Sequence, residues 1–243
     1  MIKFFTLKIL AIFDFYHQKK IFNFLKKRHL DKIDIFFDIG AHKGESINLF
    51  LKRLEIKKIF SFEASPENFS ILKNNLEKFK KKFKNNKIEI YNITLGSSDK
   101  EGVIKQIDES SSSTLNDINI DSKYFKRKKS LIYNETNNKF FKEIPVHIST
   151  LNNFIYKKKI RNIDLIKIDT EGYEYEILKG LDKNFNIVKS VIFEHHYHDM
   201  LKKKYTFTDI HSLLKNNNFN QIYKAKMPFR KTFEYIYVNN EKI

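Results

Sequence analysis

The segment over residues 33–63 constrains the fold more than any other part of the chain. An apolar run ends at Asp38 in a turn that contains Gly40 and Gly44, and a stretch with helical periodicity follows. A second apolar run then ends at Glu63. This order is typical of a strand, a tight turn, a crossover helix and a second strand. It predicts a parallel, doubly wound sheet with right-handed crossovers.

The alternation of strands and helices continues along most of the chain. Ser65 and Pro66 have the character of a helix start, with a serine N-cap and proline at the first helical position. The last two expected strands, 220–224 and 233–238, follow one another as a pair. Residues 116–142 are polar and rich in lysine, and we interpret them as a basic insertion or lid. The further strands are expected at 58–63, 88–93, 102–107, 143–148, 163–169 and 188–194, and the helices at 45–54, 65–79, 150–156, 174–181 and 207–215.

Residues 1–30 precede this domain, which we place at residues 31–243. Their apolar stretches are interrupted by charges, so none approaches the roughly 20 residues that span a bilayer. No small-residue cleavage site follows them, which argues against a signal peptide. We expect an amphipathic helical extension that packs on the domain or on a second copy, with contact to a membrane surface as the alternative. Its apolar face would consist of Phe5, Ile9, Ile12, Phe13 and Tyr16.

Composition limits the chemistry. The 243 residues include no cysteine, which excludes disulfides, thiolate zinc sites and a thiol nucleophile. The formal net charge is +17, with lysines in short, scattered runs. We interpret most of this charge as a solvated surface; nucleic acid, an anionic glycan or an anionic membrane surface is the alternative partner.

The glycine turn and Glu63 together predict a site for a cofactor that carries a ribose. Glycine lets the backbone approach a ligand, and the carboxyl ends of the strands border the ligand crevice of a doubly wound sheet. The turn lacks the middle glycine of the dinucleotide fingerprint, because His42 stands there, and it is no phosphate-binding P-loop. Glu63 follows Gly44 by 19 residues, close to the usual offset of an acidic residue that binds ribose hydroxyls.

A second group of polar residues follows the strand at 163–169. Asp169 and Glu171 precede Gly172, and their carboxylates could serve as a base, a metal site or an anchor for a cationic group. The next strand ends at Glu194, followed by His195, His196 and His198. Without thiolates or a His-Glu-x-x-His helix we expect no metal. Substrate contact or general base chemistry is the preferred role for one of these histidines.

Four stretches of the sequence, in order, resemble the FkbM family of methyltransferases. The resemblance covers roughly residues 33–200, and the stretch from Lys167 to Glu174 is its most specific part. The serine-rich segment over residues 111–115 is also similar to a loop of the family. The four stretches are Phe37-Asp-Ile-Gly-Ala-His-Lys-Gly-Glu45, Phe62-Glu-Ala-Ser-Pro-Glu-Asn-Phe69, Ser149-Thr-Leu-Asn-Asn-Phe154 and Ile163-Asp-Leu-Ile-Lys-Ile-Asp-Thr-Glu-Gly-Tyr-Glu174.

The resemblance implies a Rossmann-like class I methyltransferase fold, with a mostly parallel seven-stranded sheet, helices on both faces and a terminal antiparallel strand. It implies S-adenosylmethionine as the cofactor and methylation of an oxygen, most often in a sugar of bacterial surface glycans. The turn would contact the methionyl part of the cofactor, Glu63 the ribose and residues 92–95 the adenine. The full expected cofactor set is Asp38, Gly40, Ala41, His42, Gly44, Glu63, Ala64, Asn92, Thr94, Leu95 and Asp169.

For catalysis we prefer Asp169 as the base, with Glu171, Glu194 and His195 behind it. The acceptor would be a small molecule or glycan, and the basic segment 116–142 with Arg161 would suit an anionic or nucleotide-linked sugar. The expected location is the cytoplasm, with attachment to the inner membrane as an alternative, and a homo-oligomer is left open.

This sequence departs from the family pattern at three positions. His42 stands where the family usually has Asn, Asn152 where it usually has Asp, and Thr94 where Ala is common. Two other functions stay open as alternatives. One is an RNA or DNA methyltransferase, which the charge favours but for which no base-amine motif or RNA module is present. The other is a non-catalytic protein of this fold that binds a glycan or the cofactor.

Overall fold

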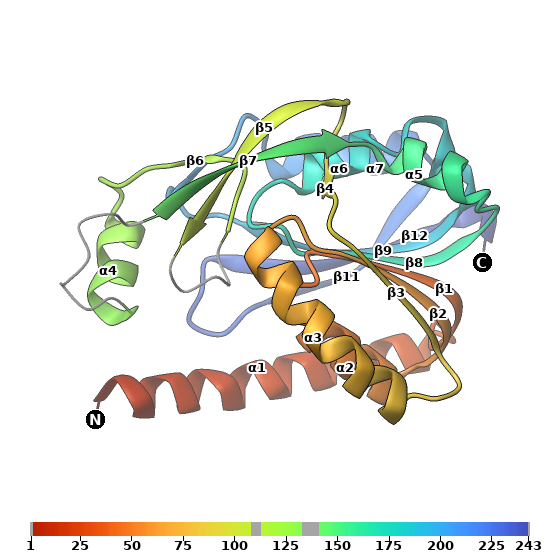
Figure 1. Ribbon diagram of the computed structural model, residues 1–243, viewed down its shortest axis with the longest axis horizontal. Helices are drawn as coiled ribbons and strands as arrows, with labels where there is room; N and C mark the ends of the chain where they lie inside the picture. Colours follow the sequence, from red (N-terminus) through yellow and green to blue (C-terminus); the bar gives the residue numbers. More distant parts are fainter. Residues whose placement is uncertain (1, 108–112, 133–140, 243) are drawn as a thin grey trace.

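A seven-stranded sheet forms the centre of the molecule (Figure 1). The computed structural model describes residues 2–107, 113–132 and 141–242. The order of the strands is β11-β12-β9-β8-β1-β2-β3. Their bounds are β1 (Lys32–Ile39), β2 (Glu55–Phe62), β3 (Lys87–Tyr91), β8 (Ile163–Ile168), β9 (Val188–His196), β11 (Phe219–Lys226) and β12 (Thr232–Asn239).

The predicted mostly parallel sheet is confirmed, and it also contains antiparallel pairs. Strands β3, β2, β1, β8 and β9 pair in parallel, whereas β12 pairs antiparallel with both β9 and β11. The antiparallel strand β12 is the last in the sequence, yet it lies inside the sheet. Strand β1 lies between β2 and β8. From β1 the strand order proceeds toward one edge of the sheet through β2 and β3, and toward the other edge through β8 and β9. This is the switch point at which doubly wound sheets bind their ligands.

Helices cover both faces of the sheet. Strand side chains alternate between the faces, so Phe36 packs in one apolar cluster and Phe37 in the other. Figure 1 shows α1, α2 and α3 below the sheet and α5, α6 and α7 above it. The bounds of these helices are α1 (Ile2–Lys27), α2 (Glu45–Arg53), α3 (Pro66–Lys82), α5 (Leu151–Lys158), α6 (Glu174–Lys179) and α7 (Phe207–Asn216), and two 3-10 turns cover Asp182–Ile187 and Asn240–Lys242.

The expected helix start at Ser65 is present. The Ser65 hydroxyl accepts the N–H of Asn68 at 3.2 Å, and Pro66 is the first helical residue. Thr150 caps α5 in the same way through the N–H of Asn153 at 3.1 Å. Both caps satisfy backbone donors that a helix start would otherwise leave free.

The middle of the chain forms smaller sheets beside the central one. Strands β4 (Thr94–Leu95), β7 (Phe141–Ser149) and β5 (Lys100–Ile107) make one, and β10 (Leu201–Lys202) with β6 (Asp117–Ile118) makes the other. The lysine-rich segment contains a helix, α4 (Lys123–Ile132), that its periodicity did not indicate. Residues 111 and 112 of the serine-rich segment lie outside the described residues.

The N-terminal helix packs through its second half. Ile21, Phe22 and Leu25 are buried in the core cluster below the sheet. Ile12 and Tyr16, which the expected apolar face includes, are more than half exposed. Figure 1 shows the first half of α1 running past the sheet, beneath α4. No helix in the described residues combines the length and the apolar character that a bilayer span requires.

Candidate active site

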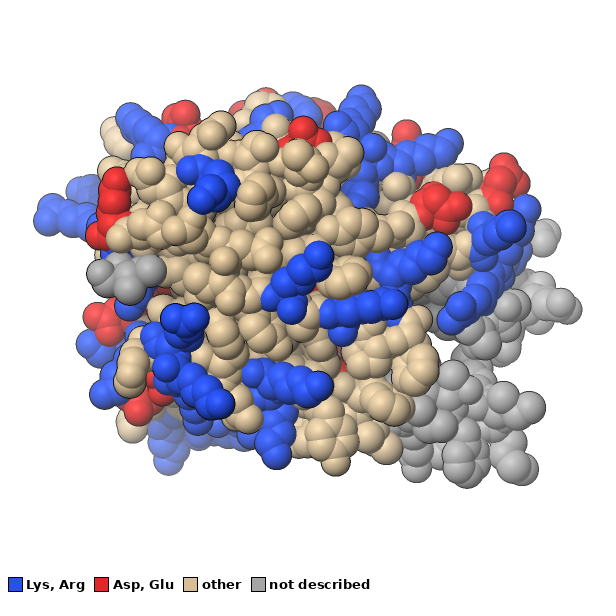
Figure 2. All heavy atoms as spheres, turned by 180° about the vertical axis from the view of Figure 1, so that it is seen from behind, with Lys and Arg blue, Asp and Glu red and all other residues tan. Residues whose placement is uncertain are grey.

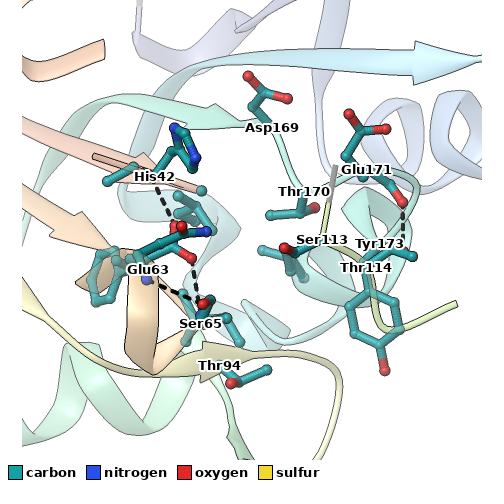
Figure 3. A pocket seen from close by; sticks show the side chains of 18 of the residues that line it. His42, Glu63, Ser65, Thr94, Ser113, Thr114, Asp169, Thr170, Glu171 and Tyr173 are labelled. Atoms are coloured by element: carbon teal, nitrogen blue, oxygen red, sulfur yellow. Dashed lines mark hydrogen bonds between the residues drawn. The ribbon is translucent and has the colours of Figure 1, made fainter. Parts of the chain in front are cut away.

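A cavity of about 510 Å³ lies at the carboxyl ends of β1, β2 and β8. Figure 3 shows His42, Glu63 and Ser65 on one side of it, Ser113, Thr114, Thr170 and Tyr173 on the other, and Asp169 and Glu171 at one edge. Nine residues that the sequence assigned to the site line the cavity: Gly40, Ala41, His42, Glu63, Ala64, Thr94, Leu95, Asp169 and Glu171. The other assigned residues, Asp38, Gly44, Asn92, Glu194 and His195, are not among the lining residues.

The glycines of the turn are required by the packing of the chain on itself. Gly40 has φ +84°, and a Cβ there would lie 1.9 Å from the carbonyl oxygen of Asp169. Gly44 has φ +98°, and its Cβ would lie 2.4 Å from the ring of Phe79 on α3. A side chain at either position would therefore meet protein atoms as well as strain the backbone.

The backbone N–H groups of the turn are all used within the protein. Those of Gly40 and Ala41 donate to the carbonyl of Phe62 at 3.0 and 2.9 Å. That of Lys43 donates to the Glu45 carboxylate at 3.1 Å, and that of Gly44 to the Ala41 carbonyl at 2.8 Å. The fifth, at position 42, donates to Glu63. The turn thus differs from phosphate-binding loops, which direct free N–H groups at an anion.

His42 fits the turn because of its backbone conformation. Its φ of +49° lies in the left-handed region, which Asn, Asp and His tolerate better than other non-glycine residues. A histidine can therefore occupy this position of the turn. Its N–H donates to Glu63 Oε2 at 2.7 Å, and its Nδ1 lies 3.2 Å from Glu45. Glu45 opens α2, so the imidazole also contacts the start of that helix.

Glu63 is held at the end of β2 by backbone donors. Its Oε1 accepts the N–H of Ser65 at 2.9 Å, while Oε2 accepts that of His42. The Asn92 side chain donates to the Glu63 carbonyl at 2.8 Å, so Asn92 fixes this loop from outside the cavity. Burial raises the pKa of the Glu63 carboxyl. The Asn68 side chain also donates to this carboxylate. A carboxylate has about four acceptor positions, so capacity remains for a bond from the cavity side.

Lys167 pairs with two carboxylates, that of Asp169 in the cavity lining and that of Asp38 outside it. Lys167 Nζ lies 3.2 Å from Asp169 Oδ2 and 3.8 Å from Asp38 Oδ1. Asp38 is fully buried and accepts the Ser46 hydroxyl at 2.5 Å, and burial raises its pKa. Burial alone would lower the pKa of Lys167, but the charges of Asp169, Asp38 and Glu194 outweigh it and raise that pKa. Asp38 therefore supports the site from underneath.

The loop after β8 is fixed in a strained conformation. Glu171 and Gly172 have φ values of +49° and +89°. The Thr114 hydroxyl donates to the Glu171 carbonyl at 2.8 Å, and the Gly172 N–H donates to Glu174 at 2.8 Å. Glu174 is fully buried and also accepts the Tyr205 hydroxyl at 2.6 Å. Strain that surrounding contacts maintain is common at functional sites.

Strand β9 ends with Glu194, His195 and His196, whose side chains alternate between the two faces of the sheet. His195 packs against Tyr205 and Phe207, and burial lowers its pKa to about 3. Glu194 is half-buried on the other face, where desolvation and then the charges of Asp169 and Glu234 raise its pKa. His196 is the histidine beside the cavity: its Nε2 lies 3.5 Å from Glu171 and its Nδ1 lies 3.0 Å from the Thr232 hydroxyl.

The cavity is acidic. Its lining includes five carboxylates, and among the described lining residues Lys167 is the only lysine or arginine; the carboxylates are Asp14, Glu45, Glu63, Asp169 and Glu171. Asp14 comes from α1, and nothing in the sequence indicated that this helix reaches the site. Across the part of the chain that the structure describes, no three His, Asp or Glu side chains are placed to hold a metal ion.

Comparisons with known proteins give a family and a fold. The family model described as Methyltransferase FkbM domain matches residues 38–220. The solved structure of magnesium protoporphyrin IX methyltransferase (ChlM) from Synechocystis PCC 6803, with bound SAM, is 8% identical, with a TM-score of 0.51 over 94% of this chain and 81% of that one. At this identity the likeness shows a shared fold only. A search of the curated proteins finds no match.

Two further solved structures are similar at lower TM-scores. Methyltransferase FkbM from Methylobacillus flagellatus KT is 15% identical, with a TM-score of 0.49 over 85% of this chain and 44% of that one. TrmK from M. capricolum, in complex with S-adenosyl-homocysteine, is 13% identical, with a TM-score of 0.48 over 86% of this chain and 63% of that one. The chain thus spans less than half the length of the first protein and less than two thirds of the second.

Proposed function

The chain belongs to the FkbM family of methyltransferases, whose model matches three quarters of it, and we propose that it methylates a hydroxyl oxygen of a sugar with S-adenosylmethionine as the methyl donor. Two of the similar structures hold SAM or S-adenosyl-homocysteine. The methyl transfer follows from the family, whereas the oxygen and the sugar are the parts that we propose.

The acidity of the cavity is the observation that carries the cofactor assignment. S-adenosylmethionine has a positive sulfonium and a positive ammonium group, and five carboxylates line the cavity. Opposite charges at short range in a site of reduced dielectric attract strongly. The pyrophosphate of a dinucleotide would be repelled by the same carboxylates. It would also meet a turn over residues 40–44 whose N–H groups already have partners.

The residues present fit this cofactor. Glu63 would accept a ribose hydroxyl, because its oxygens are oriented by backbone donors and the carboxylate retains acceptor capacity. The buried apolar side chain of Leu95 and the methyl group of Thr94 would border the adenine. The ammonium group would lie near the turn and Asp169. These contacts would align the donor, which is the main task of an enzyme that uses an already reactive methyl group.

The transfer needs a group that takes the proton of the acceptor. When bound, the cofactor supplies an electrophilic methyl group, whose bond to sulfur breaks as the bond to the acceptor oxygen forms. We assign the proton acceptor to Asp169, whose carboxylate lines the cavity and is oriented by Lys167 at 3.2 Å. Glu171, beside His196, is the second candidate. Glu194 and His195 are less suited to this role because neither lines the cavity.

The assignment of a sugar as the acceptor rests on the family and on the positive charge of the protein. Family resemblance favours glycans of the bacterial surface, whose synthesis would place the protein in the cytoplasm or at the inner membrane. Exposed Lys126 and Lys129 on α4 would attract an anionic or nucleotide-linked sugar. The test is release of S-adenosylhomocysteine on incubation with SAM and a panel of sugar nucleotides and oligosaccharides. Release that depends on a sugar supports the proposal, and release only with RNA or DNA would overturn the sugar assignment.

The net charge of +17 also favours nucleic acid as an acceptor. Figure 2 shows Lys and Arg side chains distributed over one face, separated by uncharged surface rather than gathered in a single stripe. A nucleic-acid enzyme would lose affinity steeply as salt increases, because phosphate contacts release counterions. A salt-insensitive or absent affinity for duplex and single-stranded probes would remove this alternative.

A further inference from the structure

Two elements outside the family match meet at the edge of the cavity. Asp14 of α1 lines it, and Arg230, between β11 and β12, contacts Asp14 Oδ2 through its guanidinium at 2.7 Å. One residue away on each element, the rings of Phe13 and Phe229 meet edge to face with centroids 5.0 Å apart. All four residues lie outside residues 38–220, the part of the chain that the family model matches, and we call Phe13, Asp14, Phe229 and Arg230 together the corner.

Phe229 is in an unfavourable position for a phenylalanine. Its side chain is 64% exposed, and its φ of +60° lies in the left-handed region that favours glycine. Neither the exposure nor the conformation stabilises the fold, and a bulky residue with positive φ is unusual. Phe13, its partner, is 40% exposed. An exposed aromatic pair held at a strained position is typical of a surface that binds a ligand.

The charge of Arg230 acts on Tyr124, a residue of the basic helix α4. Burial raises the pKa of Tyr124 on α4, and the charge of Glu171 raises it further, whereas Arg230 and Arg127 lower it. These opposing effects mean that the cavity carboxylate and both arginines lie within electrostatic range of one tyrosine. Asp14 accepts through one oxygen, and a guanidinium has five N–H donors, so Arg230 can bind a second anion.

We propose that Phe13, Asp14, Phe229 and Arg230 form a subsite for an acidic saccharide, through which the acceptor extends out of the cavity. The apolar face of a sugar ring would pack on Phe229, its hydroxyls would donate to Asp14, and its carboxylate or phosphate group would bind Arg230. The proposal rests on a sugar acceptor and adds that the sugar chain is acidic and longer than the unit that is methylated.

A membrane surface suits this corner less well. The charged pair of Asp14 and Arg230 lies beside the two rings, and seating the rings in a bilayer would remove that pair from water at a cost. An acidic saccharide also displaces water from the pair, but its hydroxyls and anion supply hydrogen bonds in place of those lost. The corner is also continuous with the cavity through Asp14, as an extended acceptor requires.

The test measures saccharide binding by titration calorimetry with the full chain. The probe is tetragalacturonate, and maltotetraose is the neutral probe of equal length. We expect tetragalacturonate to bind and maltotetraose to bind at least about tenfold more weakly. Arg230→Gln should weaken tetragalacturonate binding about tenfold or more, since a hydrogen bond to a charged group contributes that much. Phe229→Ala should weaken it as well, because it removes the ring on which the sugar packs. Matched controls are Tyr156→Ala, an aromatic that is 83% exposed on α5, and Arg28→Gln, also exposed.

Several outcomes would overturn the subsite. Absence of tetragalacturonate binding by protein that binds SAM would do so, as would equal binding by wild type and both subsite variants with unchanged melting curves. Vesicles of phosphatidylglycerol that bind wild type but not Phe229→Ala, without saccharide binding, would assign the corner to a membrane. Self-association lost in the same variant would assign it to a second copy. If the saccharide binds through Arg230 but SAM does not bind, the subsite stands and the proposed methyl transfer fails.

Discussion

Replacement of Glu63 by glutamine tests the ribose contact quantitatively. The carboxylate accepts backbone N–H groups from His42 and Ser65 at 2.7 and 2.9 Å and leaves acceptor positions toward the cavity. Glutamine keeps the shape but has one acceptor oxygen and turns an NH₂ group toward the other donor. Hydrogen bonds to a charged group contribute about 1.5–3 kcal/mol. Because 1.4 kcal/mol is a factor of ten, Glu63→Gln should weaken SAM binding about 10- to 150-fold.

Titration calorimetry with SAM at 25 °C measures this effect directly. The substitution also leaves one buried N–H without its acceptor, so the free energy of unfolding should fall by about 1–3 kcal/mol. Glu77→Gln is the matched control: it removes the same charge from an exposed site on α3, where the partner is Lys80. Folded Glu63→Gln protein that binds SAM within about twofold of wild type would refute the ribose assignment.

Three further predictions follow from the same geometry. Asp169→Asn should retain SAM affinity but lower turnover at least ~100-fold, measured as S-adenosylhomocysteine release with a validated acceptor; full turnover would exclude Asp169 as the base. Gly40→Ala should lower the free energy of unfolding by about 3 kcal/mol, because its Cβ would lie 1.9 Å from a backbone oxygen at positive φ, and an unchanged denaturant midpoint would contradict this. Burial lowers the pKa of His195 to about 3 from 6.5, so the unfolded chain binds more protons than the folded one between these values. The stability that the neutral imidazole confers is present above pH 6.5 and is lost as pH falls. The melting temperature of His195→Gln should therefore drop less than that of the wild type between pH 7.5 and pH 5. An equal drop in both proteins would contradict this reasoning.

The sequence predicted the part of the site that local rules determine. A glycine turn after an apolar strand, an acidic residue at the end of the next strand and a serine cap are set by neighbours in the chain. Glu63 and Ser65 therefore appear where they were expected. The sequence could not show why glycine is needed at these positions. The atoms that a Cβ at Gly40 or Gly44 would meet belong to Asp169 and Phe79, which are distant in sequence.

Contacts between distant segments account for what the sequence could not indicate. Asp14 reaches the cavity only because α1 packs under the sheet through Ile21 and Phe22. At the end of β9, alternation places His195 and His196 on opposite faces. Which face borders the cavity depends on the placement of Glu171, and that loop is fixed by Thr114, a residue 57 positions away. Contacts between residues so far apart in the sequence produce no periodic pattern from which they could be predicted.

Titration of the full chain with SAM and with NAD tests the central claim most directly. An acidic cavity with Glu63 at the ribose position and a turn without free N–H donors should bind the cationic cofactor and exclude the pyrophosphate. We predict saturable SAM binding at micromolar concentration, about −8 kcal/mol, and no NAD binding below millimolar concentration. Binding of NAD with equal or higher affinity, or no SAM binding by protein with a cooperative melting curve, would contradict the account.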